Sequence, residues 1–518
     1  MKFTVKHIKK YFILITLILL TTNIFSQYSF EWALTYGGGG WDEATNIIQL
    51  KNGNLLVSGS MRIEQENMWL LKVDAITGKA LWGKTFPGYY ISRACDLVET
   101  TDKNIVLAGY TIDNDEVNKR VWVLKIDTIG NIIWEKNFGE DLDAQAYSVI
   151  QTQDDGFIVC GSTTSTISYT LDWWILKLDQ NGDIVWEKQF GGSKEDIAKS
   201  AAELSDGSIA VTGFVGSAGG GYHSISVIKL DKDGNEIWYN VYRVNDWDEA
   251  TSIIATHDDN LAVAGFSRQA AITDYDAVVI KLNAEGDTLW QRIFGRDYFR
   301  NTPNATNIGY QKKTAGDYNK EYWDEASDII ECYDDGIVIA GFSKANELMK
   351  SDYMVVKYNA SGELIWYDFF NRQSLDIGKS IIETKENALV ICGVTYSIGN
   401  AWDYALLKYT SGEKSTLTIN NPQDSVLTII QDTIVLDICI NSYRKPVNLT
   451  VSNNSVIQEF INVFPEKDEI GECPFSMQVK LNLELGKNEI EFKALDEKKY
   501  EFIEKRIIYY LPPPSKTW

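Results

Sequence analysis

The chain has 518 residues, and its 72 acidic and 49 basic side chains give a net charge of −23 at neutral pH. A surface this acidic excludes nucleic-acid binding, because that binding depends on neutralising phosphates. It favours simple solvation, and it also suits cations or basic partners.

The first 26 residues are predicted to form a secretory signal peptide. Four lysines make a positive region before the apolar stretch Tyr11–Leu20, which is too short for a comfortable membrane span, and Ser26 provides a small residue for cleavage. The alternative is an uncleaved anchor; a lipoprotein anchor is not supported, because no cysteine follows the apolar core. We expect a bacterial protein that is secreted, periplasmic or at the cell surface, with no stable membrane span after cleavage. Loss of the four lysines would lower the net charge to −27.

A tryptophan recurs along most of the chain at a nearly constant interval. Successive members lie 50, 52, 52, 52, 52 and 76 residues apart: Trp32, Trp82, Trp134, Trp186, Trp238, Trp290 and Trp366. A period near 50 residues indicates repeated supersecondary units. Two further columns keep the same phase: Lys72, Lys125, Lys177, Lys229, Lys281, Lys357 and Lys408, and Gly59, Gly109, Gly161, Gly213, Gly265, Gly341 and Gly393.

Each repeat is predicted to contain four short strands, bounded by Gly, Asp or Asn and rich in β-branched and aromatic residues. In the third copy these are Ala146–Ile150, Gly156–Gly161, Trp173–Asp179 and Asp183–Phe190. Segments such as Val121–Ile126 are mostly apolar and hardly alternate, which indicates burial on both faces. Four-stranded sheets packed face to face around an axis give that burial. We therefore predict an all-β fold with a seven-bladed β-propeller over residues 27–412.

The two ends of the repeat region are predicted to meet. Trp32–Gly39 is a lone copy of the fourth-strand pattern, whereas the seventh copy has three strands, through Lys408, and lacks a tryptophan-containing fourth. We expect the N-terminal strand to complete the last blade, which leaves no open sheet edge. A small residue recurs in the first strand, where bulky side chains would clash as the strands converge on the axis: Ala44, Ala94, Ala146, Ala198, Ala250, Ala326 and Gly378.

The segment Val73–Trp82 resembles the tryptophan-docking repeat of pyrroloquinoline-quinone-type β-propellers, and later copies with Asp-x-x-Gly-x-x-x-Trp resemble other bacterial secreted propeller repeats. The resemblance covers roughly residues 28–412 and implies an architecture rather than an activity. Quinone enzymes of this type carry a vicinal cysteine pair and usually eight blades. Here no two of the six cysteines are adjacent and seven repeats are present, so we expect no cofactor. Cys160 and Cys392 occupy the small-residue position before the repeat glycine and are expected to be buried.

One large insertion interrupts the period. It falls between the fifth and sixth repeats, roughly at Arg296–Glu321, and is rich in Asn, Lys, Tyr and Thr. Long loops on rigid scaffolds often carry function. A tolerated, functionless insertion is the alternative.

After Ser411 the period stops, and residues 413–510 are predicted to form an immunoglobulin-like β-sandwich. The predicted strands are Ser425–Ile430, Thr433–Ile440, Val447–Val451, Met477–Leu485, Glu489–Ala494 and Phe502–Tyr510. Leu483–Ala494 resembles the late hairpin of bacterial surface Ig-like modules, and Cys439 and Cys473 are a candidate disulfide. The proline-rich residues 511–518 are either a stiff linker to a truncated or split part, or an ordinary tail.

The most distinctive polar motif is Trp-Asp-Glu-Ala, which lies where the chain enters the first strand of a blade. It occurs three times and supplies the candidate binding residues Trp41, Asp42, Glu43, Trp247, Asp248, Glu249, Trp323, Asp324 and Glu325. Tryptophans beside carboxylates suit sugars, through stacking and hydrogen bonds, or a cation. The alternative is structural: the acids cap the start of the blade and the tryptophans pack between blades.

Two other acidic patterns have structural explanations. An aspartate begins the third strand in four blades: Asp172, Asp276, Asp352 and Asp403. Together these carboxylates could hold a cation, but hydrogen bonding to neighbouring blades is the simpler interpretation. The turns at Asp179 and Asp231 resemble fragments of calcium loops, but they lack the distal glutamate and are interpreted as hairpin turns.

Catalytic motifs are nearly absent from the sequence. His223 and His257 are single residues in loops without metal-ligand spacing, and no nucleophile elbow, zinc-protease or phosphate-loop motif occurs. No catalytic residue and no metal site is predicted. We expect a non-catalytic binding or scaffold protein that presents a propeller loop face to a protein or glycan at the cell surface. The alternative is a propeller hydrolase, or the recognition portion of a larger protease or glycan-active enzyme. The oligomeric state is not predicted.

Overall fold

The computed structural model describes residues 28–510 apart from 38–39, 63, 87–89, 113–117, 140–141, 217–221, 270–273, 296–322, 346–349, 371–374, 397–401, 412–415, 422–425, 430–432, 442–445, 455, 462–474 and 497–500. These residues form 36 β-strands. None of the described segments is a helix long and apolar enough to cross a membrane.

The first 28 strands form seven four-stranded antiparallel units, here called blades 1 to 7. Blades 1 to 3 contain β2 (Asp42–Gln49), β3 (Leu55–Arg62), β4 (Glu66–Val73), β5 (Ala80–Phe86); β6 (Ile91–Glu99), β7 (Ile105–Ile112), β8 (Arg120–Ile126), β9 (Ile132–Phe138); and β10 (Ala144–Gln151), β11 (Phe157–Thr164), β12 (Leu171–Leu178), β13 (Ile184–Phe190). Blades 4 and 5 contain β14 (Asp196–Glu203), β15 (Ile209–Val215), β16 (Ser224–Leu230), β17 (Glu236–Tyr242); and β18 (Trp247–Ala255), β19 (Leu261–Gln269), β20 (Asp274–Leu282), β21 (Thr288–Phe294). Blades 6 and 7 contain β22 (Trp323–Glu331), β23 (Ile337–Ala345), β24 (Lys350–Tyr358), β25 (Leu364–Phe370); and β26 (Asp376–Glu383), β27 (Ala388–Tyr396), β28 (Trp402–Ser411), β1 (Tyr28–Tyr36). The strands predicted in the third repeat are confirmed.

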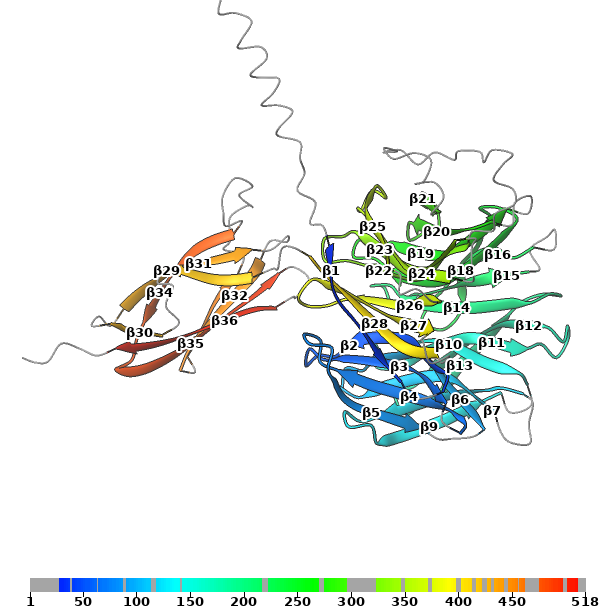
Figure 1. Cartoon of the computed structure of the whole chain (residues 1–518), viewed down its shortest axis with the longest axis horizontal. Coiled ribbons are helices and arrows are strands. Elements are labelled where there is room, and N and C mark those ends of the chain that lie inside the picture. Colours follow the sequence, from blue (N-terminus) through cyan, green and yellow to red (C-terminus); the bar gives the residue numbers. More distant parts are fainter. Residues whose placement is uncertain are drawn as a thin grey trace, which may run out of the picture.

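The blades close into a ring, which gives the β-propeller fold. Each first strand contacts the first strand of the next blade, and β26 of blade 7 contacts β2 of blade 1. As predicted, the N-terminal strand β1 pairs with β28 and supplies the fourth strand of the last blade, where Figure 1 shows the two lying side by side. Single parallel bridges, Glu66 to Ile91 and Tyr275 to Trp323, also join blades 1 and 2 and blades 5 and 6. The apolar core lies between neighbouring blades, as in the cluster that contains Ala146, Val106 and Leu176.

The recurrent tryptophans connect each blade to the next. The indole Nε1 of Trp186 in β13 donates to the carbonyl oxygen of Lys232, at 3.1 Å, in the turn between the third and fourth strands of blade 4. The same bond is made at other junctions: Trp32 to Ile76, Trp134 to Gln180, Trp238 to Ala284 and Trp290 to Ala360. Because Trp32 is in blade 7 and Ile76 in blade 1, this bond also closes the ring. The tryptophans are therefore outer-strand packing residues, as predicted.

Most of the recurrent lysines hold a turn within their own blade. Lys177 is buried, and its Nζ donates to the Asp154 carboxylate at 2.6 Å and to the Thr152 hydroxyl. Equivalent pairs recur in other blades: Lys125 with Asp102, Lys281 with Asp258 and Lys357 with Asp334. The ion pair lowers the pKa of Asp154 to about 2, although burial opposes the shift. This column is structural, since each buried ammonium needs a partner.

The recurrent glycines explain a distortion in every first strand. The pairing register between the first and second strands shifts by one residue in each blade, which marks a β-bulge: Ala44/Asn46, Ala94/Asp96, Ala146/Ser148, Ala198/Ser200, Ala250/Ser252, Ala326/Asp328 and Gly378/Ser380. A Cβ atom on Gly213, opposite the bulge of blade 4, would overlap the Ile197 carbonyl oxygen, and the other six glycines of the column meet the equivalent carbonyl. Only glycine permits this close approach.

The small-residue column is buried, but its members do not line the axis. Ala198 and its equivalents have no exposed surface, and a Cβ on Gly378 would meet Gly341 and Tyr353 of the preceding blade. They are small because neighbouring blades pack there. Cys160 and Cys392 are buried with free thiols, as expected.

Two small sheets follow the propeller. One contains β29 (Thr416–Asn421), β31 (Thr433–Asn441) and β34 (Phe475–Asn482); the other contains β30 (Val426–Ile429), β36 (Glu501–Tyr510), β35 (Gly486–Asp496), β32 (Pro446–Asn453) and β33 (Val456–Ile461). Leu436 and Val479 of the first sheet share one apolar cluster with Leu449 and Phe492 of the second. Strands β29 and β33 are not among those predicted from the sequence.

Candidate functional site

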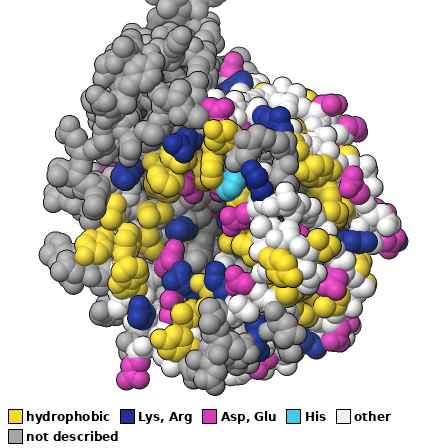
Figure 2. Space-filling model, turned by 90° about the vertical axis from the view of Figure 1, so that its right-hand side faces the viewer, with side chains coloured by type: hydrophobic (Ala, Val, Ile, Leu, Met, Phe, Trp, Pro, Cys, Tyr) yellow, Lys and Arg dark blue, Asp and Glu magenta, His cyan; other side chains and the backbone are white. Residues whose placement is uncertain are grey.

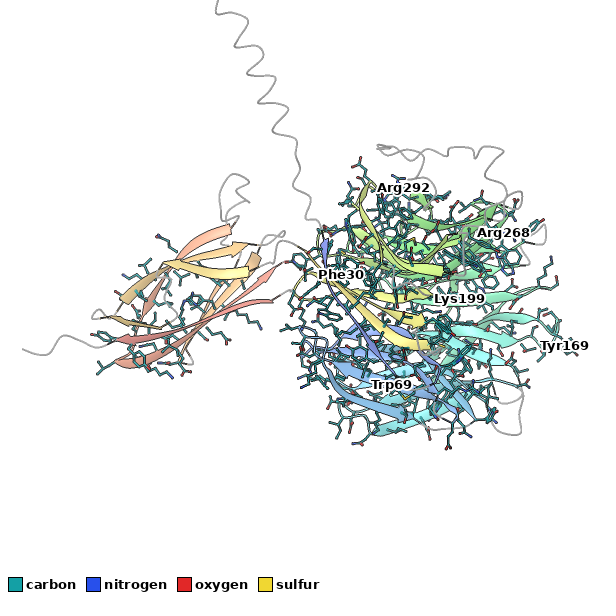
Figure 3. All side chains as sticks on the ribbon, in the orientation of Figure 1. Phe30, Trp69, Tyr169, Lys199, Arg268 and Arg292 are labelled. Carbon is teal, nitrogen blue, oxygen red and sulfur yellow. The ribbon has the colours of Figure 1, made fainter. Side chains whose placement is uncertain are left out.

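Exposed aromatic side chains gather on one face of the propeller. The connections that enter first strands and those between second and third strands emerge on this face, because successive strands of a blade are antiparallel. Trp41 and Tyr169 are 61% and 83% exposed there, and Tyr90, Ile167 and Tyr222 are exposed as well. Figure 3 labels Tyr169 at this face, and Figure 2 shows the face hollowed, with charged and hydrophobic side chains around the hollow.

The aspartates of the Trp-Asp-Glu-Ala motif hold the backbone at the start of each first strand. Asp42 is fully buried and accepts the Arg62 backbone N–H at 3.1 Å. Asp248 is also buried, and its carboxylate accepts the backbone N–H groups of Val244, at 2.8 Å, and Asn245, at 3.0 Å. Asp324 is 1% exposed. None of the three is accessible to a ligand, so the structural alternative describes this position of the motif better.

The tryptophans of the motif differ in exposure. Trp41 is open to solvent, with its ring centroid 6.3 Å from that of Trp402. Trp247 is half-buried with its ring 4.0 Å from His223, and Trp323 stacks on Tyr275 at 4.5 Å. Only Trp41 has a free aromatic face, whereas Trp247 and Trp323 also pack between blades.

The glutamates of the motif belong to one electrostatic cluster at the axis. Glu43 pairs with Lys379 at 3.2 Å and with Arg93 at 3.3 Å, which links blades 1, 2 and 7. Glu249 accepts from Trp247 Nε1 at 2.8 Å and lies 2.7 Å from His223 Nδ1.

Glu325 completes this cluster. It accepts from Trp323 Nε1 at 3.1 Å. Burial raises the pKa of Glu325 to about 7, and the charge of Glu249 adds to the shift while Lys379 and Lys199 oppose it. The structure therefore brings together the three glutamates that the sequence selected, although they come from blades 1, 5 and 6.

An open axial cavity of about 340 Å³ lies among the first strands of all seven blades. Its walls include the residue displaced by each bulge: Thr45, Cys95, Tyr147, Lys199, Thr251, Ser327 and Lys379. These residues are not among those selected from the sequence. They lie directly after the small-residue column, but a period alone does not reveal that a bulge turns them to the axis.

Two half-buried aspartates connect the first strands around this cavity. Asp96 accepts from Asn46 of blade 1, at 2.5 Å, and from the Val149 backbone N–H of blade 3, at 2.8 Å. Asp328 accepts from Ser252 of blade 5, at 2.9 Å, and from Ser380 of blade 7, at 2.8 Å. Burial raises the pKa of Asp96 to about 6. With their oxygens occupied by neighbouring blades, these acids stabilise the ring.

The other acidic patterns lie apart from this cluster. Asp172 is buried and accepts from Gln189 at 3.2 Å; Asp276 and Asp352 are also buried, whereas Asp403 is half-buried. In the hairpin turns, Asp179 accepts the Asn181 and Asp183 backbone N–H groups, and Asp231 accepts those of Asp233 and Asn235. These bonds are those of ordinary turns.

One group of metal-ligating side chains occurs among the described residues: His257, Glu331 and Asp335. His257 Nδ1 lies 2.7 Å from Glu331 and 3.2 Å from Asp335, which both belong to the next blade. Glu331 also accepts the His257 backbone N–H at 2.7 Å. The same backbone contact recurs elsewhere, from Lys51 to Glu99 and from Gln153 to Glu203, so the group is one instance of a repeated contact between blades.

Several predictions fall outside the described residues. They are the signal peptide, the whole of the 296–321 insertion, and the 511–518 tail. The candidate disulfide is also untested, because Cys473 and the side chain of Cys439 are not described.

No protein-family model matches the chain, and no curated protein matches its sequence. Similar solved structures include Sqt1 from Chaetomium thermophilum, at 10% identity and a TM-score of 0.41, covering 75% of this chain and 100% of that one. The β-propeller domain of the Trilobed protease from Pyrococcus furiosus is 9% identical, with a TM-score of 0.40 and coverage of 74% and 95%. Quinohemoprotein alcohol dehydrogenase from Comamonas testosteroni is 9% identical, with a TM-score of 0.33 and coverage of 75% and 77%. Likeness at this level carries no argument about ligand or activity.

Proposed function

We propose that this chain is a secreted or cell-surface, non-catalytic binding protein whose aromatic loop face binds a glycan. The observation that carries the proposal is the set of exposed aromatic side chains on the loop face of blades 1 to 4: Trp41, Tyr90, Tyr169 and Tyr222. Exposed aromatic faces bind sugar rings by stacking, and nearby carboxylates accept hydroxyl protons. A protein partner at the same face is the other outcome that the test below detects.

The finer architecture is part of the proposal. Residues 27–412 would be a seven-bladed, tryptophan-docked propeller, and residues 413–510 an Ig-like module that spaces it from the cell surface. The shared apolar core of the two C-terminal sheets supports the sandwich assignment. Because the chain is strongly acidic, a nucleic-acid partner is not proposed.

The test is a glycan array probed with wild-type protein and with Trp41→Ala and Tyr169→Ala. Each substitution removes an exposed ring without touching the core, so we expect unchanged folding and about tenfold or greater loss of binding. Ile129→Ala is the matched control, because Ile129 is 69% exposed in a turn on the opposite face. Unchanged binding by both aromatic variants would overturn the glycan proposal. Pull-downs with the same variants test a protein partner.

One observation favours the alternative, a propeller hydrolase. A carboxyl with a pKa of about 7 suits general acid–base catalysis at neutral pH, and Glu325 lies close enough to Glu249 for their charges to interact. Release of reducing ends from array-positive glycans by wild-type protein, and its loss in Glu325→Gln, would support hydrolysis. No release by wild-type protein would leave binding as the activity of this face.

A further inference from the structure

Lys199 has an unusual position in the wall of the axial cavity. It is the bulge residue of β14, and a bulge re-aims the displaced side chain out of the strand pairing. Figure 3 labels it in the middle of the propeller. Its Nζ lies 4.0 Å from the centroid of the Tyr147 ring and 5.9 Å from that of Phe214. Among the described residues Lys199 has no hydrogen-bond or ion-pair partner, so its ammonium keeps hydrogen-bonding capacity for a ligand.

Most of the charged groups that the argument for Lys199 involves have partners of their own, and Glu195 is a further carboxylate near it. Glu249 is held by His223 and Trp247, and Glu325 by Trp323. Lys379, the other lysine of the cavity wall, is paired with Glu43. Burial lowers the pKa of Lys199, against the opposing charges of Glu249 and Glu325. An ammonium group that loses water without gaining a close counter-ion is ready to receive an anion.

Apart from Lys379 and Cys95, the other bulge residues around Lys199 are polar and uncharged. Thr45, Thr251 and Ser327 are bulge residues like Lys199, and Tyr147 offers a ring beside the ammonium. A volume of about 340 Å³ is at the lower end for ligand pockets, which span about 300–1,000 Å³. The fit is therefore to a small molecule with several hydroxyl groups. The negative charges of Glu249 and Glu325, which act on Lys199, disfavour a ligand with two negative charges.

We propose that the axial cavity binds a hydroxylated monocarboxylate, such as a sugar acid or the acidic end residue of a glycan, with Lys199 as the group that binds its carboxylate. This inference rests on the proposed function in one respect, that the cavity and the loop face belong to one binding surface. Beyond the proposed function, it specifies the charge and the size of the group that binds at the axis. Hydroxyl groups of the ligand bind the Thr and Ser side chains of the wall.

Isothermal titration with D-gluconate, D-glucuronate and neutral D-glucose tests the proposal on the full secreted chain. Wild-type protein is expected to bind at least one acid more tightly than glucose. Lys199→Met keeps the apolar stem and removes the charge, so it should weaken acid binding about tenfold or more and leave glucose unchanged. Lys232→Met is the matched control, because Lys232 is exposed in the turn at the opposite end of the same blade.

Two results would overturn the proposal: equal binding of acid and glucose by wild-type protein, or equal acid binding by wild-type protein and Lys199→Met. Lys199→Gln, with a circular dichroism spectrum for each variant, separates lost charge from lost folding. Failure here is distinct from failure of the glycan-binding function. Array binding that depends on Trp41 but not on Lys199 contradicts only the axial site.

Discussion

At the scale of single residues, side chains of the same type make different contacts at different positions of the repeat. The outer-strand tryptophans use their indole N–H to bind the next blade, whereas Trp41 exposes its ring to solvent. Likewise, Asp42 holds backbone while Glu43, one position later, belongs to the axial cluster. The contacts of a side chain in this molecule therefore depend on one-residue differences within a repeated motif.

Replacement of Trp186 by Phe tests the connection between blades. It keeps most of the apolar contact but loses the bond to the Lys232 carbonyl, so we expect a loss of about 1 kcal/mol in the free energy of unfolding. Trp174→Phe is the control, because Trp174 bonds an exposed Glu187 within its own blade, and we expect less than about 0.5 kcal/mol. Urea unfolding measures both; equal losses would contradict the connecting role.

Glu325 predicts a dependence of stability on pH. Its pKa is raised from 4.5 to about 7 in the folded chain, so the folded state binds the proton more tightly than the unfolded state. Stability should therefore fall as pH rises from about 4.5 to about 7. Glu325→Gln should remove this decline and raise the free energy of unfolding at pH 8 by on the order of 2–3 kcal/mol. Thermal unfolding between pH 4.5 and 8 checks this, with exposed Glu285→Gln as control; parallel pH profiles for wild type and Glu325→Gln would contradict it.

At the scale of strands, the repeat could be predicted closely but the bulges could not. The strands of the third repeat and the closing strand follow from runs of β-branched residues and the lone Trp32–Gly39 pattern. The bulge depends on a close approach between Gly213 and the Ile197 carbonyl, which spacing does not reveal. Because the bulge displaces Lys199 to the axis, the residues of the cavity wall could not be predicted from the repeat period either.

Gly213→Ala tests this explanation of the bulge. The added Cβ would overlap backbone, so the strands must separate, and we expect a loss of about 3 kcal/mol or more. Gly207→Ala in the same blade is the control: its φ is +78° but nothing lies within 4 Å of the added atom, so about 1–2 kcal/mol is expected. Similar losses for the two variants in urea unfolding would mean that the close approach of the Ile197 carbonyl does not explain the requirement for glycine at position 213.

At the scale of the whole molecule, the ring brings distant positions into one site. Glu43, Glu249 and Glu325 could be selected from sequence because they share a motif, but the roles of their neighbours could not. Arg93, Lys199 and Lys379 lack the motif and come from blades 2, 4 and 7. The His257 group was missed for the same reason, because its acids come from the next blade.

Ring closure by β1 should control the stability of the whole propeller. A chain that begins at residue 37 lacks the fourth strand of blade 7 and the bond from Trp32 to Ile76, and it exposes the edge of β28. We expect it to aggregate or to lose its cooperative thermal transition, while a chain that begins at residue 28 keeps it. Light scattering and calorimetry compare the two; equal transitions would show that closure is dispensable.

The most direct test of binding at the loop face is hydrogen–deuterium exchange with and without a glycan selected on the array. We expect added protection at the starts of β2, β18 and β22, residues 41–46, 247–252 and 323–328, and in the connection that carries Tyr169. Protection confined to the outer strands, the opposite turns or the C-terminal sheets would contradict it.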